Sequence, residues 1–130
     1  MGETGEHLTF EAYQRWFREY DELRGMAEED PTASVAHLME EAGEIARHVL
    51  RLQGHKAMDE AERAAEVEAL ALELSDAFVF LTKLANSYGI EWDETIARAM
   101  EKAESRWNVE EGRRESARRR AAAGRMRDEG

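Results

Sequence analysis

The chain has 130 residues, enough for one domain with a sizeable core, and its formal charge of −11 disfavours general binding to nucleic acid or to an anionic membrane. It has no cysteine, which excludes disulfides and zinc–thiolate sites, and no apolar run long enough for a membrane span or a secretory signal. A single proline among many Ala, Glu, Leu and Arg residues favours an all-helical protein, which we expect to be cytoplasmic.

The charge is distributed unevenly along the chain. Residues 109–130 contain seven arginines and five acids, a net charge of +2, so residues 1–108 carry −13. We therefore predict a helical domain over residues 1–108 and an arginine-rich C-terminal extension over residues 109–130. The segment 109–124 is compatible with a helix but is poorly amphipathic.

The first two predicted helices span residues 8–24 and 31–53. In the first, aromatic side chains recur at helical spacing, and Gly25 is a plausible stop. The second begins at Asp30 and Pro31, which suit an N-cap and the first helical position, and Gly54 ends it.

Two acids lie at the edge of the apolar arc of the second helix. Glu41 and Glu44 are three residues apart, so they lie on one side of the helix. His37 and His48 extend them into a single stripe at spacings of four, three and four, whereas Glu40 lies further out. We expect the histidines to line the acidic site, to flank it, or to lie on the surface.

The third predicted helix, residues 59–88, carries a second acidic pair. Glu73 and Asp76 are again three apart, and Phe80 and Lys83 continue their stripe. Glu73 falls among leucines, where an ionised carboxylate is costly unless a positive charge compensates it. A fourth helix is predicted over residues 92–107.

Four carboxylates that converge in a helical bundle would bind a hard divalent cation, and Mg²⁺ with Mn²⁺ as the alternative is the expected cofactor. The competing interpretation is a solvated acidic surface, because a chain with 29 acids contains such spacings by chance. The Glu-x-x-His pattern of di-iron bundles is not met.

Four sequence blocks resemble a known family in their order and spacing. They are LMEEAGEI at 38–45, ELSD at 73–76, YGI at 88–90 and KAESRW at 102–107. The chain resembles the MazG-like all-α nucleoside triphosphate pyrophosphohydrolases, whose signature is E-x-x-E, a gap, and E-x-x-D. The gap here is 28 residues, 45–72. The resemblance covers residues 8–107 and is nearest to the deoxycytidine-triphosphate pyrophosphatase branch.

The resemblance implies a fold, an assembly and a set of site residues. The fold is a four-helix-bundle-like MazG-type arrangement, assembled as a homodimer or homotetramer. The implied metal ligands are Glu41, Glu44, Glu73 and Asp76, with Glu41 or Glu44 as the catalytic base and Glu40 as a further acid.

The resemblance also implies residues that contact the substrate. Lys102 and Arg106 match a basic pair, and Phe80 matches an aromatic residue that contacts the base. We expect Lys83 to join the cations, and Trp107 or Trp16 either to stack on the base or to pack in the core. Ala103 stands where the family block has asparagine, and Trp107 where it has tyrosine. Leu50 and Arg51 stand where the branch has tryptophan, which leaves the substrate base open.

The expected reaction is Mg²⁺-dependent cleavage of a (deoxy)nucleoside triphosphate into monophosphate and pyrophosphate, a house-cleaning role for the nucleotide pool. A dUTPase-like or phosphoribosyl-ATP pyrophosphohydrolase activity on the same fold is the nearest alternative. A non-enzymatic helical module that docks a partner through its basic tail is the alternative from another class. Neither a membrane nor a nucleic acid is expected as a partner.

Overall fold

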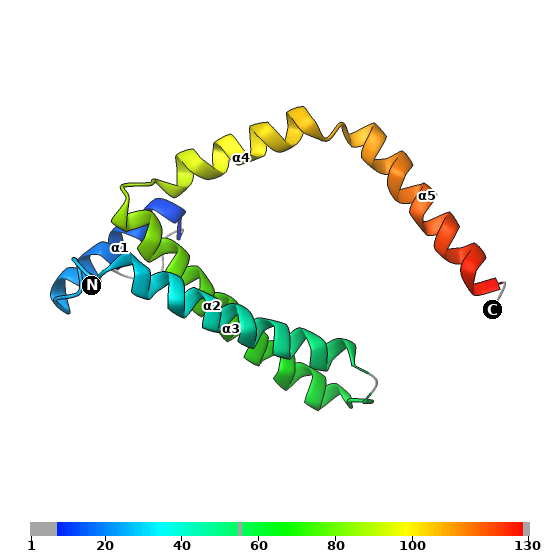
Figure 1. Ribbon diagram of the computed structural model, residues 1–130, viewed down its shortest axis with the longest axis horizontal. Coiled ribbons are helices and arrows are strands. Elements are labelled where there is room, and N and C mark those ends of the chain that lie inside the picture. Colours follow the sequence, from blue (N-terminus) through cyan, green and yellow to red (C-terminus); the bar gives the residue numbers. More distant parts are fainter. Residues whose placement is uncertain (1–7, 55, 129–130) are drawn as a thin grey trace. The chain divides into compact units, whose positions relative to one another are not determined.

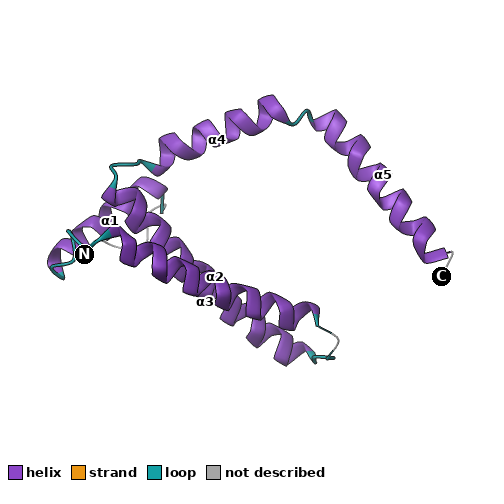
Figure 2. Cartoon of the chain, in the orientation of Figure 1, coloured by secondary structure: helices purple, strands orange, loops and turns teal. Residues whose placement is uncertain are grey.

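The computed structural model describes residues 8–54 and 56–128, and within them the ordered elements are all helices (Figures 1 and 2). In chain order they are α1 (Phe10–Leu23), α2 (Pro31–Gln53), α3 (Glu60–Ser87), α4 (Trp92–Arg106) and α5 (Val109–Asp128). The predicted all-helical class is confirmed, and no strand occurs in the described part of the chain. The four-helix-bundle arrangement and the assembly into dimers or tetramers remain predictions.

Local side-chain chemistry fixes where the two central helices begin. The Asp30 carboxylate accepts a hydrogen bond from the Thr32 N–H, with Pro31 in the first turn of α2. At the start of α3, Asp59 and Glu62 form a capping box in which each side chain accepts a hydrogen bond from the other residue's backbone N–H. The predicted start of α2 is confirmed, and that of α3 within one residue.

Helices α2 and α3 form an antiparallel hairpin joined by a short connection at residues 54–59 (Figure 1). Helix α1 packs against the C-terminal half of α3 through aromatic side chains. The Tyr13 ring stacks on Phe78 with centroids 5.2 Å apart, and Phe10 lies 6.2 Å from Phe78. Phe17, on the same face of α1, is buried. The aromatic stripe of α1 therefore serves as packing surface within this unit.

A fully buried amide holds α1 against the end of α3. Gln14 donates hydrogen bonds from Nε2 to the Ile90 carbonyl at 2.9 Å and to Asn86 Oδ1 at 3.2 Å, while its Oε1 accepts from the Trp92 N–H at 2.8 Å. Gly89 has a φ of +64°, which lets the chain turn sharply after α3. This network joins α1 to the end of α3 and to the turn that follows it, all within the first unit.

The chain separates into two compact units, the first ending at Trp92 and the second beginning at Asp93. The second unit contains most of α4 and all of α5. Its described surface is mainly polar and exposed, with same-helix ion pairs such as Arg114–Glu110 and Arg119–Glu115. The predicted domain boundary at residue 108 stays a prediction.

Many large apolar side chains of α2 and α3 are exposed, among them Met39 at 66% and Leu72 at 64%. Val35, Val49 and Leu74 are also exposed. So many exposed large apolar side chains on two helices are consistent with the predicted assembly of several copies. Among the described residues, no helix is both long and apolar enough to cross a bilayer.

Candidate functional site

The facing sides of α2 and α3 bring three of the predicted acids together. Glu41 of α2 meets Glu73 and Asp76 of α3, and one carboxylate oxygen from each lies within 4.8 Å of the other two. Glu41 and Glu73 are partly buried and Asp76 is exposed. The three-residue spacing within α3 aims both of its acids at the same part of α2. The arrangement is a group of oxygen donors of the kind that binds a hard divalent cation.

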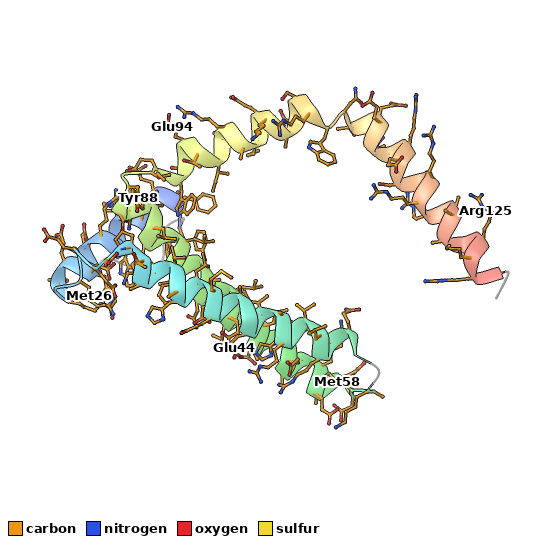
Figure 3. The ribbon with its side chains drawn as sticks, viewed as in Figure 1. Met26, Glu44, Met58, Tyr88, Glu94 and Arg125 are labelled. Carbon is orange, nitrogen blue, oxygen red and sulfur yellow. The ribbon has the colours of Figure 1, made fainter. Side chains whose placement is uncertain are left out.

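A second group of potential ligands adjoins the first and shares one residue with it. Glu44 and His48, one turn apart on α2, lie with Glu73 so that one donor atom of each falls within 4.8 Å of the others. Glu73 thus belongs to both groups. Figure 3 labels Glu44 part-way along the hairpin, away from its connecting loop at Met58. Together the two groups contain all four predicted carboxylates and one imidazole.

The clustered carboxylates change each other's proton affinity. A side-chain hydrogen bond to Glu73 raises the pKa of Glu41, and burial and the charges of Glu73, Asp76 and Glu40 raise it further. Within residues 8–54 and 56–128, neither Lys nor Arg forms an ion pair with Glu41, Glu73 or Asp76. These carboxylates repel one another, so the residues fit a bound cation.

Glu44 differs from the other acids because it already has a cationic partner. Arg47, one turn further along α2, donates from Nε to Oε2 of Glu44 at 2.9 Å, and its second hydrogen bond goes to the same oxygen. The Glu44 side chain is 45% exposed, so this pair contributes little to stability. The other oxygen, Oε1, receives neither of these hydrogen bonds.

Glu66 contacts one residue of the second group, His48, and the sequence analysis did not single it out. It hydrogen-bonds His48 Nδ1, and this contact lowers the pKa of Glu66 below its ordinary value. Arg51 lies 3.8 Å from the same carboxylate. The signal was present in the sequence, because Glu66 precedes Glu73 by seven residues, two helical turns, on one side of α3.

Lys83 lies in a different environment from the one expected for a phosphate contact. Its ammonium is buried, 2.8 Å from Glu29 and 3.8 Å from Asp21, and the hydrogen bond from Lys83 lowers the pKa of Glu29. All three line a pocket of about 170 Å³ between α1 and the C-terminal part of α3. Both observed partners of Lys83 are therefore protein carboxylates.

The remaining predicted contacts are distributed over both units. The Phe80 ring stacks on His37 with centroids 5.1 Å apart, and His37 Nδ1 lies 3.3 Å from Glu40. Glu40 is exposed and His37 is half-exposed, so this pair lies at the surface of the hairpin. The other predicted contacts, Lys102, Arg106 and Trp107, are exposed in the second unit.

The sequence matches the model of the MazG nucleotide pyrophosphohydrolase domain over residues 29–109, more than half of the chain. The matched range contains both acidic pairs and the hairpin that brings them together. The chain belongs to the MazG family.

A curated relative is similar to this chain over most of its length. The uncharacterized protein YvdC of Bacillus subtilis (strain 168) is 35% identical over 97 residues, which cover 72% of this chain and 92% of the relative. The comparisons support the nucleotide pyrophosphohydrolase family, a class of hydrolases that generally uses a divalent metal. They do not identify the deoxycytidine-triphosphate pyrophosphatase branch. For this MazG-family chain, the acidic hairpin is the candidate site.

Proposed function

We propose that the chain is a Mg²⁺-dependent nucleoside triphosphate pyrophosphohydrolase, with Mn²⁺ as an alternative ion. Its products would be a nucleoside monophosphate and pyrophosphate. The observation that carries the proposal is the meeting of the two acidic pairs, within a MazG domain, at Glu73. Without a cation, such a cluster would repel a triphosphate, and a divalent ion reverses that repulsion.

The chain's own residues would divide the work in this way. Glu41, Glu44, Glu73 and Asp76 would hold the metal, which supplies Lewis-acid polarisation of the phosphate oxygens when bound. The attacking water adds to phosphorus at the α–β linkage, the bridging P–O bond breaks, and pyrophosphate leaves. Glu41 or Glu44 would accept the water's proton, and Glu41 is favoured because Glu44 is already paired with Arg47.

The substrate contacts are proposed from the family resemblance. Lys102 and Arg106 would neutralise the charge that builds on pyrophosphate, and Phe80 or Trp107 would stack on the base. Lys83 could join them only by giving up its contact with Glu29. Phenylalanine has no hydrogen-bonding group, and an apolar pocket separates close analogues by only about 1–3 kcal/mol. We therefore expect deoxynucleoside triphosphates, pyrimidine or modified ones first, with modest discrimination.

A product analysis tests this function. Canonical and modified triphosphates are incubated with Mg²⁺ and the products resolved by chromatography, for the wild type, Glu41→Gln and Asp76→Asn. Glu68→Gln is the matched control, because Glu68 is an exposed acid of α3 outside both ligand groups. We expect pyrophosphate from the wild type and the control, and a loss of at least about 100-fold in both site variants, of the size that removing one group from a preorganised site causes.

Two outcomes would overturn the assignment: orthophosphate as the sole inorganic product, or full activity in both site variants. Including dUTP and phosphoribosyl-ATP in the panel separates the related activities on this fold. If no triphosphate is hydrolysed and Mg²⁺ leaves the melting curve unchanged, the non-enzymatic interaction module is the better account.

A further inference from the structure

The buried imidazole of His48 distinguishes one half of the site from the other. The group Glu41, Glu73 and Asp76 offers oxygen atoms alone, whereas the group Glu44, His48 and Glu73 includes a ring nitrogen. The His48 side chain is only 7% exposed, and it lies on the face of α2 that meets α3. His48 is therefore a buried polar residue beside Glu44, Glu66 and Glu73, and its position calls for a structural or functional reason.

The contact with Glu66 determines which nitrogen of His48 is free. The oxygen of Glu66 that contacts His48 Nδ1 also lies 3.8 Å from the Arg51 guanidinium, and a carboxylate oxygen accepts hydrogen bonds from such donors. With Glu66 as the acceptor, Nδ1 of His48 is the donor of this hydrogen bond, and Nε2 is the ring nitrogen that faces the cluster. Histidines that bind metals usually donate their other N–H to a carboxylate in this way, which fixes the tautomer and the ring orientation.

The free nitrogen points at the cluster without forming a hydrogen bond there. Nε2 of His48 lies 3.8 Å from Oε1 of Glu73, too far for a hydrogen bond. Metal–ligand bonds of about 2.0–2.2 Å place two ligand atoms of one ion at most about 4.4 Å apart. The donor atoms of Glu44, His48 and Glu73 already lie within 4.8 Å of one another, so each would move by less than about 1 Å to bind the same ion. A carboxylate oxygen of Glu44 is the third potential donor, and the Oε1 atom of Glu44 receives neither Arg47 hydrogen bond.

We propose that Glu44, His48 and Glu73 form a second cation position, distinct in ligand chemistry from the all-oxygen position, that takes a divalent transition-metal ion with Nε2 of His48 as a ligand. Imidazole suits zinc, iron, nickel and copper ions, whereas Mg²⁺ prefers oxygen donors. Glu73 would bridge the two positions, and Glu66 would be the positioning residue of His48. The inference rests on the proposed function only in using Glu73 and Glu44 as ligands.

The test is nitrogen NMR of the full chain labelled with ¹⁵N-histidine, titrated with Zn²⁺ and separately with Mg²⁺. Calorimetry establishes saturation, and the His48 signals are assigned by their loss in His48→Gln or through contacts with Glu66. We expect Zn²⁺ to move the Nε2 resonance of His48 to the metal-bound range while Nδ1 keeps its proton. Mg²⁺ should not do this. His37 is the matched control, because it lies on the same helix outside both groups.

Affinity provides a second readout. His48→Gln should weaken Zn²⁺ binding at least tenfold with Mg²⁺ binding changed less than about threefold, and Glu66→Gln should weaken Zn²⁺ binding about 10–100-fold through the ring orientation. An Nε2 resonance that does not move at Zn²⁺ saturation, or a ring that keeps both protons there, overturns the proposal without any variant.

The two proposals fail separately. If the wild type releases pyrophosphate with Mg²⁺ but Nε2 never binds Zn²⁺, the nitrogen position is wrong and the hydrolase stands. If Nε2 binds Zn²⁺ but no triphosphate is cleaved, the nitrogen position stands and the hydrolase is wrong.

Discussion

We expect Glu73→Gln to raise the stability of the metal-free protein and to abolish its stabilisation by Mg²⁺. Glu73 is the residue that both ligand groups share, and its side chain is 23% exposed. Glutamine keeps the size and the polarity of the side chain while removing the negative charge. The substitution therefore separates the charge of the cluster from its packing.

The magnitude follows from the geometry. At 4.8 Å, the largest separation within the cluster, two unit charges repel by about 0.9 kcal/mol at the dielectric constant of water and by about 3.5 kcal/mol at an effective value of 20. Because Glu41 takes up a proton more readily than usual, part of this repulsion is relieved in the wild type. We expect a gain of about 1–2 kcal/mol, or roughly 3–10 °C in melting temperature for a domain of this size.

The pH dependence has a definite sign. Because the pKa of Glu41 is raised in the folded state, its contribution to stability is fully present below its ordinary value of 4.5 and is lost as the pH rises through the folded value. Above the folded pKa of Glu41, both Glu41 and Glu73 are ionised, and the repulsion between them that Glu73→Gln removes is at its full strength. The gain should be small at about pH 4 and largest well above the folded pKa of Glu41, at about pH 8.

Calorimetry or dye-based melting with and without Mg²⁺ measures both effects. In the wild type, an ion at 100 times its dissociation constant adds about 2.7 kcal/mol by binding the native state alone. Glu68→Gln serves as the control for removing one acid from α3. Identical wild-type melting curves with and without Mg²⁺, or an equal gain in the control, would refute the reasoning.

Two further outcomes are expected. Lys83→Met should lower the free energy of unfolding, measured in urea, by about 2–4 kcal/mol, because it leaves Asp21 and the partly exposed Glu29 without their cation. A loss below about 0.5 kcal/mol would contradict the ion pairs. Light scattering should detect a homodimer or tetramer, because α2 and α3 expose large apolar side chains; a 14.9 kDa species at every concentration would disprove this.

The helices could be predicted from the sequence because their signals are local. Asp30 followed by Pro31 marks the start of α2 through a cap that depends on neighbouring residues alone. The three-residue spacing of Glu73 and Asp76 likewise requires only the helical repeat. Signals of this kind depend little on tertiary contacts, so the sequence predicts the helix boundaries and the face of each helix that carries the acids.

The partners across helices could not be predicted in the same way. Whether His48 lies on the surface or against Glu66 depends on the register of α2 against α3, which no local spacing encodes. Lys83 shows the same limit, because its stripe on α3 suggested a substrate phosphate, and its partners come from α1 and the loop before α2. A periodic stripe gives the face of a helix, whereas tertiary packing decides what that face meets.

The hairpin also has a consequence for the order in which the molecule folds. All residues of the two ligand groups lie on α2 and α3, which are joined by a connection of a few residues, so no donor has to wait for a distant part of the chain. Contacts between segments close in sequence form early, because the loop that must close is short. The ligand atoms and their scaffold therefore belong to one local segment, which is complete in the chain before α4 is synthesised.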